Sequence, residues 1–120
     1  MDAAGHFDLN PLAQLLKALA DPTRLGMVAL LAHGELCVCH LQAALGLPQS
    51  TTSRQLSILR AGGIVETRRS QRWVHYRLAR PSAPACAAQL GGLVRQFRRS
   101  EEARATYQRL VRDLGPGACP

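Results

Sequence analysis

The feature that most constrains the fold is a pair of short helical segments separated by a tight glycine turn. The first segment runs over about residues 39–45 and is closed by Gly46. The second runs over about residues 50–61, with Leu56 and Leu59 on one side and polar side chains on the other. Two short helices around such a turn, the second with a polar face, are typical of a helix-turn-helix, the alternative being an ordinary helical hairpin.

A pair of strands follows this unit directly. Residues 64–69 and 72–79 alternate between apolar and polar side chains, as strands with two unlike faces do. Ser70 and Gln71 lie at the expected tip, flanked by arginines. A hairpin placed directly after a recognition helix can act as a wing that reaches a groove or the DNA backbone. The expected fold class is therefore mainly α with a β-hairpin wing, a winged helix-turn-helix.

Helices are expected on both sides of this unit. Asn10 and Asp21 are each followed by proline, and a capping side chain before proline is a strong start signal. Residues 85–114 indicate one long helix or two consecutive ones, with Ser100 able to start the second.

The length and layout indicate a single domain covering residues 1–120, with a tail at about 115–120. A chain of this size leaves apolar surface exposed, and we expect a homodimer. No stretch approaches the roughly 18 apolar residues of a membrane span, and the acidic N-terminus lacks the layout of a signal peptide. We therefore expect a cytoplasmic protein that does not associate with membranes.

Charge is divided unevenly along the chain. The formal net charge is +7, and residues 60–120 carry all of the excess, because residues 1–59 sum to −1. The positive charge of the basic half comes entirely from arginine, which suits bidentate contacts to phosphate or guanine. A basic half on a small domain favours nucleic acid as the partner.

The polar face of the second helix and the wing supply the candidate DNA contacts. The helix residues expected at the major groove are Ser50, Thr51, Thr52, Ser53, Arg54 and Gln55. Of these, Ser50 could also cap the helix, and Thr52 could bond backbone or phosphate instead of a base. The wing residues expected at phosphate or in the minor groove are Arg68, Arg69 and Arg72.

Cys37 and Cys39 are the candidate sensor. Thiolates select soft, thiophilic ions, so this pair suits arsenite or antimonite, or Cd, Hg or Cu(I), better than Mg or Ca. On a regular helix, positions two apart point about 200° away from each other and cannot grip one small ion. In an extended segment they point the same way. Chelation is therefore expected to unwind the start of the first helix-turn-helix helix, which would move the recognition helix.

Three stretches together resemble the ArsR/SmtB family of metal-responsive repressors, and its arsenic-sensing ArsR branch in particular. They are residues 35–39 (ELCVC), 50–63 (STTSRQLSILRAGG) and 72–78 (RWVHYRL), and the resemblance covers about residues 10–114. It implies a homodimeric winged-helix repressor of its own resistance operon that binds double-stranded operator DNA. It further implies release from DNA by As(III) or Sb(III), with no cofactor required.

One position departs from that family. The arsenic branch commonly carries a third cysteine three residues after the second, where this chain has Gln42. Cys119 on the tail and Cys86 are the candidate replacements, and a small cellular thiol or a site of two thiolates are alternatives. His40 could also approach the ion, but it is expected instead to be a surface residue. The zinc-sensing members use Asp and His pairs along the dimer helix, and residues 85–99 contain neither.

Three functions are alternatives to that of an arsenic-responsive repressor. A repressor of the same fold could sense redox state through a disulfide, or respond to Cd, Hg or Cu. A constitutive architectural DNA-binding protein would not depend on its cysteines. An enzyme is not expected, because the chain has no Cys-x-x-Cys motif in a βαβ setting and no nucleophile–base pair at suggestive spacing.

Overall fold

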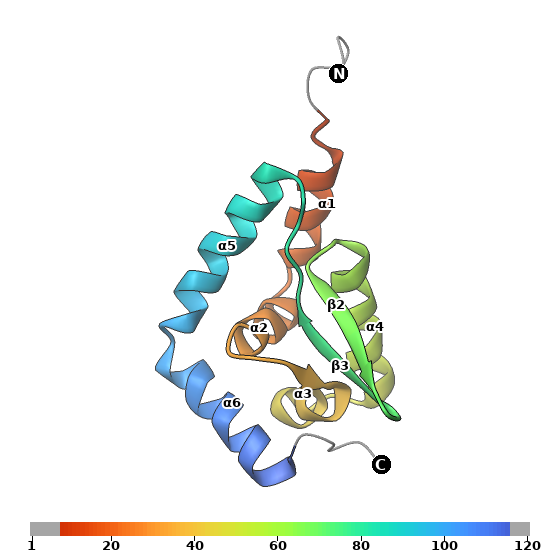
Figure 1. Cartoon of the computed structure of the whole chain (residues 1–120), viewed down its shortest axis with the longest axis vertical. Helices are drawn as coiled ribbons and strands as arrows, with labels where there is room; N and C mark the ends of the chain where they lie inside the picture. The colour runs from red at the N-terminus through yellow and green to blue at the C-terminus, as the bar shows by residue number, and fades with distance from the viewer. Residues whose placement is uncertain (1–7, 116–120) are drawn as a thin grey trace.

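The structure, a computed structural model, describes residues 8–115. In this range six helices accompany three short strands (Figure 1). In chain order these are α1 (Asn10–Leu19), α2 (Pro22–Leu31), β1 (Leu36–Cys37), α3 (Val38–Leu45), α4 (Gln49–Ala61), β2 (Val65–Ser70), β3 (Trp73–Leu78), α5 (Pro84–Arg98) and α6 (Glu101–Leu114). The expected fold class, mainly α with a β-hairpin wing, is confirmed.

Two of the expected helix starts are capped as the sequence indicates. The Asp21 carboxylate accepts the N–H of Arg24, the third residue of α2, at 3.0 Å, and the Ser100 hydroxyl accepts the N–H of Ala103 in α6 at 3.1 Å. These bonds satisfy N–H groups that have no partner inside the helix. The cap at Ser100 also separates α6 from α5, so residues 85–114 form two consecutive helices.

The other two expected caps are wrong by one or two residues. Asn10 is the first residue of α1 and Leu9 precedes it without a side-chain cap, while the Asp8 carboxylate accepts the Asn10 N–H at 3.0 Å. Ser50 lies inside the first turn of α4. Pro48, two residues before Ser50, has an extended backbone (ψ 155°) and is the N-cap, so α4 begins at Gln49.

The wing is an antiparallel hairpin of β2 and β3, and β1 pairs with the other edge of β3. Ser70 pairs with Trp73, which leaves Gln71 and Arg72 as the two-residue turn. The tip is therefore one residue later than expected. Gln71 adopts a left-handed backbone conformation (φ 56°), as tight two-residue hairpin turns require.

The core joins α1, α2, α3 and α4 to the sheet. The largest fully buried side chains include Leu15, Met27, Leu36, Leu41, Leu56, Leu59 and Ile64. Leu56 and Leu59 occupy the inner side of α4, as the periodicity predicts, and α3 packs against α4.

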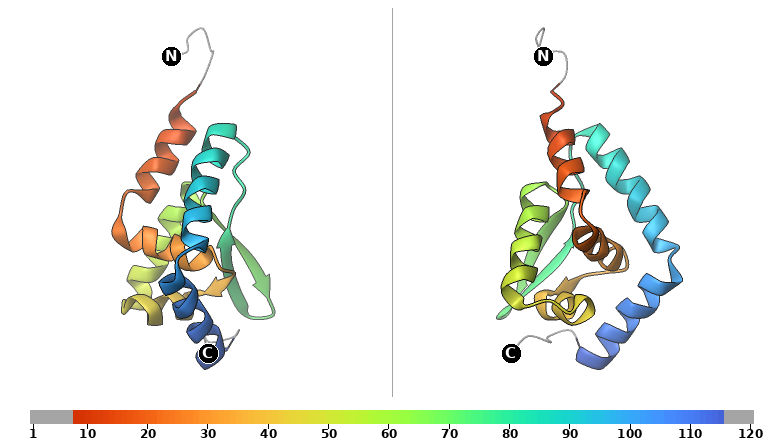
Figure 2. Two further views of the ribbon diagram at one scale, coloured as in Figure 1. Left: turned by 90° about the vertical axis from the view of Figure 1, so that its left-hand side faces the viewer. Right: turned by 180° about the vertical axis from the view of Figure 1, so that it is seen from behind.

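The last two helices wrap around the outside of the core. α5 runs beside α1 and α2, the chain bends at Arg99 and Ser100, and α6 then crosses to α3 (Figures 1 and 2). Leu110 is buried in this contact and Tyr107 is half-buried. Within residues 8–115, no helix is both long enough and apolar enough to cross a membrane.

Candidate metal centre and DNA-binding surface

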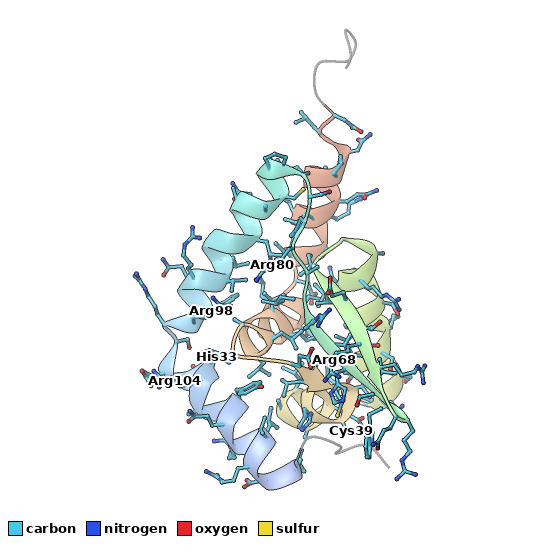
Figure 3. The ribbon with its side chains drawn as sticks, in the orientation of Figure 1. His33, Cys39, Arg68, Arg80, Arg98 and Arg104 are labelled. Carbon is cyan, nitrogen blue, oxygen red and sulfur yellow. The ribbon has the colours of Figure 1, made fainter. Side chains whose placement is uncertain are left out.

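Cys37 lies where the sheet ends and α3 begins. Its backbone is extended (φ −91°, ψ 172°), it pairs with His75 of β3, and only 1% of its surface is exposed. Cys39 lies in the first turn of α3, next to the wing, and is partly exposed (Figure 3). The expected order of an extended segment followed by a helix is therefore present, with the two cysteines on either side of the junction.

The two sulfurs of this pair differ in oxidation state. Cys39 is disulfide-bonded, whereas Cys37 and Cys86 carry thiols. A soft ion is held by thiolates, so this junction can bind one only after Cys39 is reduced. Among residues 8–115, no three side chains of Cys, His, Asp or Glu are already grouped around a possible ion.

His40 is buried, with 2% of its surface exposed, so its expected place on the surface is wrong. Its Nδ1 accepts the Cys37 N–H at 3.1 Å and lies 3.1 Å from Cys37 Sγ. Its Nε2 lies 2.5 Å from the carbonyl oxygen of Gly115. A carbonyl can only accept, so Nε2 carries the hydrogen and Nδ1 presents its lone pair. Burial lowers the pKa of His40, and the bond to Gly115 opposes this in part.

The contact that buries His40 comes from a residue distant in the sequence. Its partner, Gly115, is 75 residues further along the chain, at the end of α6. The same helix holds the residues before Cys37, because the Tyr107 hydroxyl donates to the carbonyl of Glu35 at 3.2 Å. Burial, and then the charge of Glu35, raise the pKa of Tyr107. α6 therefore contacts the sensor segment on both sides of Cys37.

Of the two candidate third ligands, Cys86 does not lie at this junction. Cys86 is buried at the start of α5, where Pro11, Gln14 and Gly62 share a cavity of about 240 Å³ with it. The start of α5 and α3 lie at opposite ends of the molecule (Figure 1). Cys119 lies outside the described residues.

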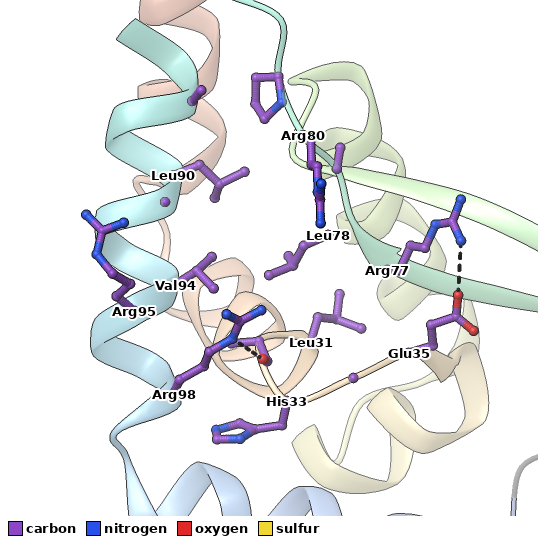
Figure 4. Close-up of a pocket in the computed structure, with 16 residues that line it drawn as sticks. Leu31, His33, Glu35, Arg77, Leu78, Arg80, Leu90, Val94, Arg95 and Arg98 are labelled. Carbon is purple, nitrogen blue, oxygen red and sulfur yellow. Dashed lines mark hydrogen bonds and ion pairs between the residues drawn. The ribbon is translucent and has the colours of Figure 1, made fainter. Parts of the chain in front are cut away.

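A cavity of about 700 Å³ lies between α5, the turn after α2 and the end of β3 (Figure 4). No cysteine lines it. Its walls tie α5 to the turn that leads to Cys37, since Arg98 Nε donates to the Ala32 carbonyl at 3.0 Å. Arg77 on the opposite wall contacts the Glu35 carboxylate at 3.5 Å.

The polar side chains of α4 fall into two groups. Ser50 and Arg54 are exposed, and Thr51 and Ser53 are partly exposed. Thr52 is fully buried and its hydroxyl donates to the Pro48 carbonyl at 3.0 Å, which is the backbone bond expected as the alternative to a base contact. This bond to the preceding turn consumes the group that would have faced a base.

Gln55 is engaged within the protein as well. Its Oε1 accepts from Arg24 Nη1 at 2.7 Å, and Arg24 Nε donates to the Ala18 carbonyl at 2.6 Å. Arg24 therefore ties α4 to α1 and α2. Sequence reasoning missed this role, although a lone arginine in an otherwise apolar helix was a signal available to it.

The wing arginines also differ from one another. Arg68 forms a bidentate pair with the Glu35 carboxylate, at 2.7 and 3.1 Å, and this bond lowers the pKa of Glu35. Arg72 lies over the Trp73 ring, 5.4 Å from its centroid, and Arg69 is exposed. The charges of Arg69 and Arg72 are therefore more available at the tip than that of Arg68.

Comparison with known proteins places these features among bacterial regulators. Residues 21–67 match the family described as "Bacterial regulatory protein, arsR family". The chain is 45% identical over 107 residues to the "Arsenical resistance operon repressor" of Escherichia coli K12, covering 88% of this chain and 86% of that protein. It is 46% identical over 74 residues to the "Biofilm growth-associated repressor" of Xylella fastidiosa strain Temecula1, covering 62% and 65%.

Solved structures give the same result for the fold. A homodimeric winged helix-turn-helix DNA-binding domain from Mycobacterium bovis, described as a possible ArsR-family regulator, superposes with a TM-score of 0.61. The two sequences are 35% identical, and the match covers 78% of this chain and 88% of that one.

Proposed function

This chain belongs to the ArsR family of bacterial transcriptional repressors, and we propose that trivalent arsenic or antimony, bound by Cys37 and Cys39, releases it from operator DNA. Members of this family are DNA-binding regulators rather than enzymes. The observation that carries the proposal is the position of the two cysteines on either side of the start of α3. α3 packs against α4, which carries the polar face for DNA.

Chelation has a direct mechanical consequence at this position. Arsenite enters as As(OH)₃, and each thiol that replaces a hydroxyl forms an As–S bond and releases one water. Cys37 is extended but Cys39 lies in a helical turn, so their sulfurs can share one arsenic only if the first turn of α3 unwinds. Unwinding shifts α3 against α4, and the ion thereby favours the conformation that does not bind DNA.

The third ligand comes from outside the described residues or from solution. Cys119 is the proposed third thiolate, because Cys86 is buried against α1 at the far end of the molecule. A small cellular thiol, or an arsenic that keeps one hydroxyl, would serve equally. Crystal structures with and without arsenite that share one geometry for residues 36–42 would rule out the unwinding mechanism.

On operator DNA, the exposed side of α4 is proposed to read bases. The side chains involved are Ser50, Thr51, Ser53, Arg54 and Gln55, with Gln55 leaving Arg24 on binding. Arg69 and Arg72, and Arg68 on leaving Glu35, are proposed to contact phosphates or the minor groove. A homodimer predicts a pseudo-palindromic operator with half-sites about one helical turn apart.

The test is operator binding followed by fluorescence anisotropy. Protein reduced with a phosphine, which adds no competing thiol, is titrated with arsenite, antimonite, cadmium, zinc and peroxide in turn. We expect arsenite and antimonite to release the DNA, and Cys37→Ser or Cys39→Ser to abolish release while operator affinity stays intact. Binding that ignores every ion and both substitutions would refute the proposal.

A second candidate is a redox-sensing repressor. The disulfide at Cys39 favours it, because a cysteine placed to form a disulfide can change state with the redox conditions. Peroxide that releases the operator where arsenite does not, with release lost in Cys39→Ser, would select this function.

A further inference from the structure

We propose that the cavity between α5, the turn after α2 and the end of β3 binds a small organic anion, one with a carboxylate or phosphate head on an apolar body. The cavity measures about 700 Å³, within the range of about 300–1,000 Å³ that is usual for small-molecule sites. Because no cysteine lines it, this ligand is separate from the arsenic of the proposed function.

The inner wall of the cavity is apolar. Leu31 of α2 and Leu90 and Val94 of α5 line it and are buried in the core. Leu78 at the end of β3 lies across from them (Figure 4). Small-molecule sites combine such apolar walls with a few polar groups that fix the orientation of the ligand. This wall therefore suits an apolar body.

Two arginine side chains reach into the cavity from opposite walls. Arg80 follows β3, and Arg98 lies in the last turn of α5 (Figure 4). The bond from Arg98 Nε to the Ala32 carbonyl holds this side chain and leaves both of its Nη groups available as donors. Arg80 forms no hydrogen bond or ion pair with any residue between 8 and 115. Both guanidinium groups can therefore donate to a ligand.

The charge of the cavity is complementary to an anion. Among the described residues that line it, Glu35 is the one carboxylate, and it is bound by Arg68 and Arg77. Neither Arg80 nor Arg98 forms an ion pair with a carboxylate of the described chain. A guanidinium group matches the oxygens of carboxylate and phosphate with two parallel hydrogen bonds. Two such groups beside an apolar wall favour an anionic head on an apolar body.

The cavity is separate from the surface proposed to bind the operator. None of the side chains proposed to contact DNA lines it. α5 and α4 lie on opposite sides of the molecule (Figures 1 and 2). The arginines of the cavity are therefore available to a small anion while α4 faces DNA.

Two neighbouring glycines of α5 allow the cavity to be blocked by substitution. Gly91 lines the cavity, and a Cβ there would meet only the end of the Arg95 side chain, at 3.6 Å. Gly92 does not line it, and its Cβ would meet the same side chain at 3.8 Å. Leucine is a better helix former than glycine, so α5 should tolerate it at either position.

The test is calorimetric titration of the full chain with naphthylacetate, naphthyl phosphate and the uncharged naphthylacetamide. We expect one anion to bind per chain, and naphthylacetamide to bind about tenfold or more weakly because it lacks the charge. The ratio of the two anion affinities identifies the preferred head.

The variants locate the site. Arg80→Gln should weaken anion binding by about tenfold or more, and Gly91→Leu should abolish it by filling the cavity. The matched controls are Arg99→Gln and Gly92→Leu, which change neighbouring residues that do not line the cavity. Both should bind the anions as wild type does.

Absence of binding by both anions, or unchanged binding in Arg80→Gln and Gly91→Leu, would overturn the inference. Binding that strengthens as the protein is diluted would also overturn it, because a second copy of the chain would then fill the cavity. Should Gly91→Leu fail to fold by circular dichroism, NMR of wild-type protein decides instead. Nuclear Overhauser contacts from the naphthyl protons to the methyl groups of Leu31, Leu78 and Leu90 support the site, and contacts only elsewhere refute it.

Discussion

At the scale of single residues, the polar face of α4 contains side chains of two kinds. Arg54 and Ser50 face solvent. The Thr52 hydroxyl instead donates to the Pro48 carbonyl, and Gln55 Oε1 accepts from Arg24. A buried polar group needs a partner inside the protein, and the buried Thr52 hydroxyl and the partly buried Gln55 amide each have one. We therefore expect specificity for DNA to depend most on the side chains of α4 without such internal bonds.

Arg54→Ala tests this division. An arginine that reaches guanine from the major groove contributes roughly 1–3 kcal/mol of discrimination, so we expect operator affinity to fall by about tenfold or more. Arg60→Ala removes an equally exposed arginine near the end of the same helix and should cost much less. Anisotropy at one fixed salt concentration checks both, and equal losses would contradict the assignment.

Glu35 gives the protein an acid-sensitive element. Its pKa is lowered from an ordinary value of 4.5, first by the bond from Arg68. The unfolded chain therefore takes up this proton at a higher pH than the folded chain does. The pair stabilises the fold fully above pH 4.5, and the contribution is lost as the pH falls through the lowered pKa.

In wild type, the unfolding free energy should fall as the pH drops below 4.5, and Glu35→Gln should make this fall smaller. Urea unfolding between pH 7 and pH 3.5 measures it, with Glu66→Gln as the more exposed control on the same sheet. Identical pH dependence in wild type and Glu35→Gln would count against the pair.

The sequence predicts residues whose roles are local, and misses those fixed by distant contacts. The caps at Asp21 and Ser100 were predictable, because each capping side chain and the N–H that it accepts lie within four residues of each other. The burial of His40 depends on Gly115, and the role of Arg24 depends on Gln55, 31 positions away. No window of neighbouring residues contains either pairing.

At the scale of elements, α6 braces the junction of β1 and α3. Tyr107 bonds the backbone ahead of Cys37, and the end of α6 bonds His40 behind it. Unwinding the first turn of α3 must therefore break or shift the contact with Gly115. The helix-turn-helix and hairpin follow from local periodicity, whereas the place of α6 follows only from packing.

Gly34→Ala should loosen this brace. An added Cβ would collide with the Tyr107 hydroxyl, and Gly34 has a φ of +153° that other residues rarely adopt. We expect the loss of unfolding free energy to be about 1–3 kcal/mol, as for other overpacked sites. Chemical unfolding and proteolysis of α6 report the change.

Gly46→Ala provides the control for backbone strain alone. Gly46 also has a positive φ (+66°), but its Cβ would meet no neighbour within 4 Å. It should lower stability without making α6 more sensitive to protease. Equal protease sensitivity in the two variants would contradict the brace.

At the scale of the whole molecule, apolar surface remains uncovered on α1 and on the residue just before it. Leu9 and Leu16 are 51% and 48% exposed, and the described chain is elongated, at 53 × 29 × 23 Å. The Mycobacterium bovis relative is homodimeric. Burial of these leucines by a second copy would remove the apolar surface that a 120-residue chain cannot cover alone.

Leu16→Glu should therefore shift the protein toward a 13.0 kDa monomer and weaken operator binding. Leu114→Glu changes a similarly exposed leucine on α6 and should leave the dimer intact. Sedimentation equilibrium distinguishes the two, and a Leu16→Glu protein of unchanged mass would place the interface elsewhere.

The regulator function was predictable from the sequence, and the comparisons with relatives confirm it.

The proposed response to arsenic depends most on Cys37 and Cys39, which would couple arsenic binding to DNA release. The direct measurement is the arsenite concentration that half-releases operator DNA from phosphine-reduced wild-type and Cys37→Ser proteins of equal operator affinity. We predict release from wild type at stoichiometric or modest excess arsenite, and none from Cys37→Ser over the same range. Equal release from both proteins, or from neither, would contradict the claim.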